Sequence, residues 1–315
     1  MKGLKLNNKS KLRNKLFNSG TVWAIFRFIL LLGLSYVIIS PFLKKIAMMF
    51  ISPADLRNPT VWMVPQEPTL DNIRRVIDYG DYIPAFFNSL IIALLCALLQ
   101  TFTCCMAGYG FAKFKFKGNI IFFILAVFTI VVPPQTLSLA LYTKFRYFDI
   151  FNILSLTGIG PLKLVETVLP STILSATALG LKNGRYIFVM RQFFKGVPNE
   201  LNEASFVDGC NPIKTFFKIM FPIAKPMLIS IFLLSFAWQW TDTFYSGLFN
   251  RSMLVLPTIL TKVTAIATEA ISNGTMMSSV MQNTAVIMII FPIFVFYLIF
   301  QRKLIQGIER SGIVG

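Results

Sequence analysis

The stretch PAFFNSLIIALLCALLQTFTCCMAGYG, residues 84–110, contains 27 consecutive residues without a charged side chain. A helix needs about 20 predominantly apolar residues to cross the hydrocarbon core of a bilayer. Residues 84–110 are therefore predicted to form a transmembrane helix. Five further long apolar stretches support an all-α integral membrane protein with six transmembrane helices: 23–43, 119–142, 168–194, 222–248 and 282–300.

The composition of the 315-residue chain points to the same class of protein. Hydrophobic residues make up 55% of the chain and charged residues 14%, whereas soluble domains carry about 25% charged residues. The chain has no histidine, which removes imidazole from general acid–base catalysis, from Ser–His or Cys–His nucleophiles and from zinc sites. We therefore predict a non-enzymatic protein with no catalytic residue and no metal site. The four cysteines show no metal-binding spacing and are expected to pack as reduced, small apolar side chains.

The placement of charge predicts how the helices are oriented. A net charge of +17 would suit a nucleic-acid partner, but here the charges follow the predicted spans. With the N-terminus inside, the inner segments (1–27, 111–119, 182–226 and 301–315) hold 20 of the 30 basic residues and 4 of the 13 acidic ones. This excess of basic residues inside predicts cytoplasmic termini and a multi-pass protein of a bacterial-type plasma (inner) membrane. Membrane lipid, and not nucleic acid, is the expected partner of the basic segments.

Three regions are expected along the chain. Residues 1–22 are predicted to be a basic cytoplasmic tail, and residues 23–300 the six-helix transmembrane domain. Residues 301–315 are predicted to be a second cytoplasmic tail. The first apolar stretch is long and has no small-residue cleavage site after it, which favours an uncleaved helix over a signal peptide.

The loop 195–226, KGVPNELNEASFVDGCNPIKTFFKIMFPIAKP, is the most informative polar segment. Pro198 and Asn199 suit the start of a short helix, whose first turn carries two glutamates where carboxylates meet the positive end of the helix dipole. Gly209 suits its end, because glycine accepts the left-handed conformation. The predicted helix, residues 199–209, projects from the membrane; an ordinary structured loop is the alternative interpretation.

A second helix is predicted directly after the first. Asn211 and Pro212 suit its cap and first turn, and Lys214 and Lys218 lie toward its polar side. Its apolar residues recur at helical spacing, which predicts an amphipathic helix on the membrane surface: Ile213, Phe216, Phe217 and Met220.

These residues resemble a known family. Glu203-Ala204-Ser205, Asp208-Gly209, Ile219, Pro222 and Pro226 are similar to the EAA motif of the permease subunits of binding-protein-dependent ABC importers. Further matches to the carbohydrate branch, the maltose-type sugar permeases, are Arg191–Phe194, Pro198–Leu201, Asn88–Leu90, Ala107–Ala112, Trp238–Asp242, Gln301–Arg302 and Gly307–Ile308. Two positions depart from the pattern: Ser205 replaces alanine, and Thr241 stands where asparagine is common.

The resemblance implies a type I ABC importer permease fold and a set of partners. In that family the short loop helix docks into a cytoplasmic ATPase dimer, which binds ATP and Mg. The chain itself lacks a GxxxxGK[ST] phosphate loop, so no cofactor is expected in it. A second homologous permease and an extracytoplasmic solute-binding protein are the other implied partners. The residues that would couple the chain to the ATPase are Glu200, Glu203, Ala204, Ser205, Asp208 and Gly209.

Two groups of residues are candidates for the solute pathway. The predicted fourth span is interrupted by Pro170, Gly180 and Gly184, and it contains Lys182, Asn183 and Arg185. A cation near the middle of the membrane costs about 2.5–3.5 kcal/mol on insertion scales, so such side chains tend to face a cavity. There they would bind hydroxyl groups or attract carboxylates; alternatively, they snorkel at the outer interface.

The second group mixes aromatic rings with hydrogen-bond acceptors, as sugar sites do: Trp238, Gln239, Trp240, Asp242 and Tyr245. An aromatic belt at the membrane interface is the alternative interpretation. The combined prediction is the permease subunit of an ATP-driven importer that moves a carbohydrate, expected to be an oligosaccharide, by alternating access. A polyamine or amino-acid ABC permease and a non-ABC membrane carrier remain the alternatives. The lack of histidine and the scarcity of intramembrane carboxylates argue against an intramembrane enzyme.

Overall fold

The computed structural model describes residues 19–61, 64–150, 152–158, 160–270 and 274–312. Within these ranges the ordered elements are helices, apart from one isolated β-bridge between Phe148 and Leu162. The prediction of an all-α protein is thus confirmed. Most of the predicted N-terminal tail lies outside the described residues.

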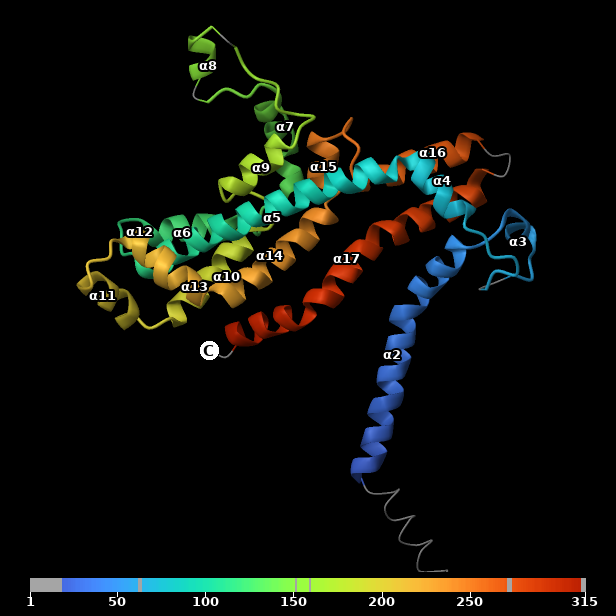
Figure 1. The fold of residues 1–315 in the computed structure, drawn as a ribbon, viewed down its shortest axis with the longest axis horizontal. Helices are drawn as coiled ribbons and strands as arrows, with labels where there is room; N and C mark the ends of the chain where they lie inside the picture. Colours follow the sequence, from blue (N-terminus) through green and yellow to red (C-terminus); the bar gives the residue numbers. More distant parts are fainter. Residues whose placement is uncertain (1–18, 62–63, 151, 159, 271–273, 313–315) are drawn as a thin grey trace, which may run out of the picture.

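In the described part of the chain, three helices are long and apolar enough to cross a membrane: α2 (Ser19–Met49), α5 (Tyr82–Lys113) and α17 (Gly274–Gly312). Helix α17 runs on beyond Phe300 without a break. Helix α2 extends away from the other helices and meets them near its C-terminal end, where it contacts α17 (Figure 1). The remaining predicted spans are not single helices of membrane length, for reasons that can be traced to particular residues.

The predicted span 119–142 is divided by two prolines. Helix α6 (Asn119–Phe128) ends ahead of Pro133, and a 3₁₀ turn, η1 (Pro134–Leu137), leads into α7 (Ser138–Arg146). A proline has no backbone N–H and clashes with the preceding helical turn. The prediction of one continuous helix in this segment was therefore wrong.

The predicted span 168–194 is divided into α9 (Leu169–Ala176) and α10 (Asn183–Gly196). The backbone between them turns through two left-handed residues, Ala178 (φ 59°) and Lys182 (φ 64°). Gly180 lies in this break, as the sequence of the predicted fourth span suggested. Pro170 instead lies in the first turn of α9, where proline is tolerated, and Gly184 lies inside α10.

The predicted span 222–248 contains α14 (Lys225–Trp240) and α15 (Phe244–Phe249). Helix α14 is preceded by α12 (Pro212–Thr215), a π-helical segment (Phe216–Met220) and α13 (Phe221–Ile223). The segment from Pro212 to Ile223 meets α14 at an angle of 78°. If this bent pair is counted as one span, four segments are long and apolar enough to cross a membrane among the described residues.

The shorter elements lie at the two ends of this bundle. Helix α11 (Glu200–Val207) lies at one end, and α3 (Pro53–Arg57) and α4 (Asp71–Gly80) lie at the other (Figure 1). Helix α16 (Leu256–Ala270) packs against α4 and α17. An arm that carries α8 (Ile153–Leu156) projects beyond α7 and α9 (Figure 1).

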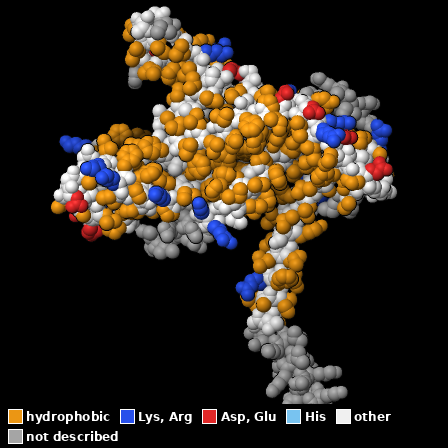
Figure 2. Space-filling view, viewed as in Figure 1, with side chains coloured by type: hydrophobic (Ala, Val, Ile, Leu, Met, Phe, Trp, Pro, Cys, Tyr) orange, Lys and Arg blue, Asp and Glu red, His pale blue; other side chains and the backbone are white. Residues whose placement is uncertain are grey.

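Helix α5 forms the centre of the bundle and packs against α9, α10 and α14. Small residues permit close approach: a Cβ added to Gly108 would lie 2.4 Å from Cβ of Met190 and 2.9 Å from the backbone N of Arg191. Another face of α5 exposes a helical stripe of large apolar residues to the surroundings: Ile83, Phe87, Ile91, Leu95, Leu98, Phe102 and Met106. Figure 2 shows hydrophobic side chains over the middle of the molecule and most of the charged ones toward its ends, an arrangement that suits a bilayer.

Candidate functional site

Helix α11 has one exposed face and one face attached to the bundle. The side chains of Asn202 and Ser205 are buried, whereas Glu200, Glu203 and Ala204 are exposed. Three apolar residues share this exposure: Leu201 is 42% exposed, Phe206 41% and Val207 88%. A short helix that displays apolar side chains between carboxylates has the composition of a protein interface.

Hydrogen bonds hold the buried face of α11 to the end of α5. The Tyr109 hydroxyl donates to Oδ1 of Asn202 at 3.0 Å. Lys113 Nζ donates to the carbonyl oxygen of Val197 at 2.6 Å and to Oδ1 of Asn199 at 2.7 Å, ahead of the first turn of α11. The short helix is therefore fastened to the bundle through polar contacts at two points.

Ser205 links α11 to the following helix. Its hydroxyl lies 2.8 Å from that of Thr215 in α12, and it donates to the carbonyl oxygen of Asn202 at 2.7 Å. Ser205 is only 2% exposed. Among the predicted coupling residues, Ser205 therefore faces inward and positions the helix.

The end of α11 follows the sequence prediction. Gly209 adopts φ +76°, and a Cβ there would meet no atom within 4 Å, so the conformation and not crowding favours glycine. Asp208 is exposed beside it. The sequence did not identify Leu201, Phe206 and Val207 as the apolar surface of this helix, because only the fold shows that their side chains remain exposed.

The helix after α11 begins as predicted but packs differently. Oδ1 of Asn211 accepts from the backbone N–H of Lys214 at 2.8 Å, which caps α12. Phe216 and Met220 are buried in the core beside Tyr109, because the π-helical segment turns them inward. The prediction that both lie on a membrane surface was therefore wrong.

The second candidate site surrounds the break between α9 and α10. Gln100 of α5, 1% exposed, donates from Nε2 to the carbonyl oxygen of Leu181 at 3.2 Å and accepts a hydrogen bond from the Ser235 hydroxyl of α14. A Cβ on Gly180 would lie 2.5 Å from Nε2 of Gln100. One amide side chain thus joins three segments and leaves no space for a side chain at Gly180.

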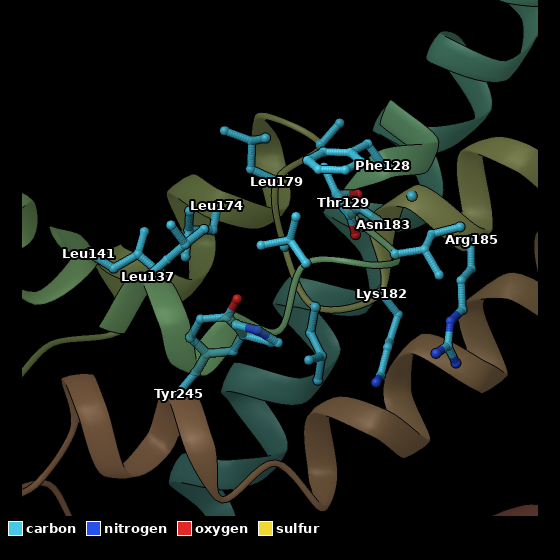
Figure 3. A pocket seen from close by; sticks show the side chains of 17 residues that line it. Phe128, Thr129, Leu137, Leu141, Leu174, Leu179, Lys182, Asn183, Arg185 and Tyr245 are labelled. Atoms are coloured by element: carbon cyan, nitrogen blue, oxygen red, sulfur yellow. The ribbon is translucent and has the colours of Figure 1, made fainter. Parts of the chain in front are cut away.

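A cavity of about 290 Å³ opens at this break. Its apolar wall comes from α6, η1, α7, α9 and the chain between α6 and η1, and its charged residues come from the start of α10 (Figure 3). The polar and aromatic residues that line it include Thr129, Lys182, Asn183, Arg185 and Tyr245. Such an apolar cavity with a few convergent polar groups is the usual form of a small-molecule site.

The structure brings most of the predicted pathway residues together. Nζ of Lys182 lies 4.6 Å from the centre of the Trp238 ring, within the range of a cation–π contact. Lys182 also interacts electrostatically with Asp242, whose carboxylate accepts from the backbone N–H of Ser246 at 3.0 Å. Tyr245 follows on the next helix and faces the same cavity (Figure 3).

Trp240 does not belong to this group. It is 2% exposed, packs against Phe86 and Phe236, and donates its indole N–H to the carbonyl oxygen of Ile289 at 3.0 Å. These contacts make Trp240 part of the packing between α5, α14 and α17, and the structure does not bring it to the cavity. Gln239 is buried on the same helix, at 8% exposure.

The depth of the cavity follows from helix lengths. Helix α10 has 14 residues, and at 1.5 Å per residue it separates Asn183 from the end near α11 by about 21 Å. The hydrocarbon core of a bilayer is about 30 Å thick. Lys182 therefore lies about 21 Å along α10 from the end near α11, and it lines the cavity.

No group of three or more His, Cys, Asp or Glu side chains that could hold a metal ion occurs among the described residues. The cysteines are free thiols, and Cys96, Cys104 and Cys105 are buried in the helix packing. The two candidate sites are the exposed helix α11 and the cavity at the α9–α10 break.

Comparison with known proteins identifies relatives of similar length. The chain is 26% identical over 287 residues to the arabinooligosaccharides transport system permease protein AraQ of Halalkalibacterium halodurans, covering 90% of this chain and 93% of that protein. It is 29% identical over 258 residues to the trehalose transport system permease protein SugB of Mycobacterium tuberculosis, covering 80% and 85%. The matches span most of both chains.

A solved structure shares the fold. A chain from the crystal structure of a bacterial ABC transporter involved in the import of the acidic polysaccharide alginate superposes with a TM-score of 0.68 at 18% sequence identity, covering 90% of this chain and 97% of that chain. The family model for the binding-protein-dependent transport system inner membrane component matches residues 104–310. This match includes α11, α14 and the cavity at the break, and the chain therefore belongs to the family of inner membrane components of binding-protein-dependent transport systems.

Proposed function

We propose that this chain is the permease subunit of an ATP-driven importer for a carbohydrate, most simply an oligosaccharide. The family membership and the sugar-transport names of its relatives support this assignment. The cavity at the break also offers amide, aromatic and cationic groups of the kind that bind sugars. Two cations beside that cavity disfavour a polyamine as the solute, because like charges repel.

The observation that carries the proposal is the exposed face of α11. The apolar side chains of Leu201, Phe206 and Val207 are not covered by any described part of the chain. The opposite face of α11 is hydrogen-bonded to α5 and α12. We infer that a cytoplasmic ATPase dimer covers this face. Glu200, Glu203 and Asp208 would offer charge-assisted hydrogen bonds around the apolar centre.

Six membrane spans and cytoplasmic termini are part of the proposal. The broken segments α6–α7, α9–α10 and α14–α15 would each serve as one span, and α2, α5 and α17 as the others. Non-helical backbone at membrane depth is tolerated where it lines a cavity, which is the position of the break beside Lys182. The excess of basic residues in the segments next to α11 supports the cytoplasmic side for that helix.

The attachment of α11 suggests how ATP binding would move the bundle. A displacement of α11 reaches α5 through Tyr109 and Lys113, and it reaches α14 through Thr215 and the 78° bend. ATPase closure would thereby shift two central helices together and open the cavity to the two sides of the membrane in turn. The second permease would pack on the exposed apolar faces, and a solute-binding protein would deliver the solute at the opposite end.

Two glycines with the same backbone conformation, one after α11 and one in a different loop, provide a test with its own control. Gly209 and Gly158 both adopt positive φ (+76° and +81°), and in both places an added Cβ meets nothing within 4 Å. The tagged chain is expressed with the ATPase and binding-protein genes of its own system, and ATPase recovery and ATP-dependent sugar uptake are measured. Gly209→Val should lower both, whereas Gly158→Val, which strains a different loop equally, should retain the ATPase. The proposal fails if no ATPase accompanies the wild-type chain, or if uptake continues without ATP.

A further inference from the structure

The cavity at the α9–α10 break carries a surplus of positive charge. Lys182 and Arg185 both line it, and their side chains extend in the same direction (Figure 3). The one salt bridge found among the described residues, between Lys262 and Asp81, lies elsewhere. Lys182 has only a minor electrostatic effect on Asp242, and neither Lys182 nor Arg185 forms a salt bridge in the described part of the chain. The side chain of Arg185 is exposed, so its guanidinium remains available to a ligand.

A buried amide at the same place has no partner of its own. Asn183 is 2% exposed, and neither its Nδ2 nor its Oδ1 has a hydrogen-bond partner in the described structure. Leaving such a buried group unsatisfied destabilises the fold. Asn183 lies between Lys182 and Arg185 in the sequence and belongs to the cavity lining, so a polar ligand that reached it would give the amide a hydrogen-bond partner.

The remaining lining indicates the shape of that ligand. Tyr245 and the apolar side chains of Leu137, Leu141 and Leu174 face the cationic edge across the cavity (Figure 3). A flat, partly apolar body with hydroxyl groups and one anionic substituent would match such an arrangement. A volume of about 290 Å³ is at the lower end for ligand sites and suits one sugar ring better than a chain of them.

We propose that this cavity binds a carboxylate-bearing sugar unit, a uronate, during its passage through the permease. Arg185 binds the carboxylate through its planar guanidinium, Lys182 adds long-range attraction, and Asn183 exchanges hydrogen bonds with the ring hydroxyls. The inference rests on the proposed carbohydrate importer and narrows its solute to an acidic sugar. A lipid phosphate shares the anionic chemistry, but about 21 Å of α10 separate the site from the end of the bundle next to α11.

The test compares two disaccharides that differ in their carboxylates. The intact permease–ATPase complex, purified without binding protein in phosphatidylcholine nanodiscs, is dialysed against labelled digalacturonate or galactobiose. We expect tighter binding of digalacturonate, weakened about tenfold in Arg185→Gln, as the loss of one charge-assisted hydrogen bond predicts. Lys182→Gln should weaken it less, and Arg185→Lys should restore part of it. Lys144→Gln removes a charge from α7 outside the cavity lining and should have no effect.

The outcomes separate this inference from the proposed function. Equal binding of the two sugars, no binding of digalacturonate, or unchanged binding in Arg185→Gln would each overturn the uronate site. If ATP-dependent uptake of a neutral sugar continues in that case, the importer assignment is retained and only the uronate site is rejected. Adding phosphatidylglycerol to the nanodiscs distinguishes the lipid source: competition with digalacturonate that disappears in Arg185→Gln would make the site a lipid site and overturn the proposal.

Discussion

The hydroxyl of Tyr109 donates a hydrogen bond to Oδ1 of Asn202 at 3.0 Å and so joins the C-terminal part of α5 to the buried face of α11. The Tyr109 ring also packs against Phe114, which caps α5, and against Phe194 and Phe216 of two other segments. This one side chain therefore connects the short projecting helix with the aromatic packing beneath it. Rigid attachment is what a helix needs if it is to transmit force to its neighbours.

Replacing Tyr109 with phenylalanine tests that attachment. Tyr109→Phe keeps the ring packing but leaves Oδ1 of the buried Asn202 without its donor, which should cost about 1 kcal/mol of local stability. Backbone amides of α11 should then exchange with deuterium about fivefold faster in the purified protein. Tyr79→Phe is the matched control, because Tyr79 is 50% exposed. Unchanged exchange in α11 would contradict the role of the bond.

An acidic substitution tests the exposed face of α11. Val207 is 88% exposed, so Val207→Asp should leave the thermal stability of the chain within about 0.5 kcal/mol. It should weaken capture of the ATPase by roughly tenfold, because a buried unpaired charge is costly in an interface. Leu156→Asp, at 84% exposure in the α8 arm, serves as the control and should not alter capture. Equal effects of both variants would argue against α11 as the contact surface.

Two nearby glycines of α5 should respond in opposite directions. A Cβ at Gly108 would lie 2.4 Å from Cβ of Met190, whereas one at Gly110 would meet nothing within 4 Å. Gly108→Ala should therefore destabilise the α5–α10 packing by about 1–3 kcal/mol. Gly110→Ala should be neutral or stabilising by up to about 1 kcal/mol through helix propensity. Thermal unfolding in detergent measures both, and a lower Tm for Gly110→Ala than for Gly108→Ala would contradict the packing argument.

A carboxylate near the α15–α16 connection should make one loop contact depend on pH. The Ser252 hydroxyl, together with its backbone N–H at 2.9 Å, donates to Glu166 and holds the pKa of that carboxyl below its usual range. A depressed folded-state pKa stabilises the structure above the unfolded pKa of about 4.3, and the effect is lost as pH falls through the lower folded value. Glu166→Gln should consequently speed amide exchange at Ser252 at pH 7. The difference from wild type should shrink as pH falls below the unfolded pKa and disappear below the lower folded-state pKa; a difference that stays constant with pH would be inconsistent with an ionised acceptor.

The loop around α11 could be predicted from sequence because its signals are local. Asn211 with Pro212 caps one helix, and Gly209 at φ +76° ends the other. Each of these residues acts through its own backbone or a neighbour within a few positions, so the sequence alone predicted the helix bounds. The direction in which Ser205 faces depends on Thr215 across the turn, and local signals do not determine such a contact.

The cavity was only partly predictable. Lys182, Asn183 and Arg185 stood out because cations and amides are rare inside apolar spans. The exact break was not visible, since it depends on left-handed backbone at Ala178 and Lys182, neither of them a glycine. These conformations are held by tertiary contacts such as the bond from Gln100 to the Leu181 carbonyl, which joins residues 81 positions apart.

The sequence by itself determined that this protein is helical and lies in a bilayer. Its apolar stretches are long enough to span the hydrocarbon core, and in lipid a helix satisfies its own backbone hydrogen bonds. It also determined the loop helix, because capping and glycine preference act over a few residues. Only the tertiary structure decided which of two neighbouring tryptophans is buried: Trp240 packs between helices, while Trp238 remains 45% exposed beside Lys182. Residues on one helix share the same local preferences, so their separate roles arise from the faces that distant helices cover.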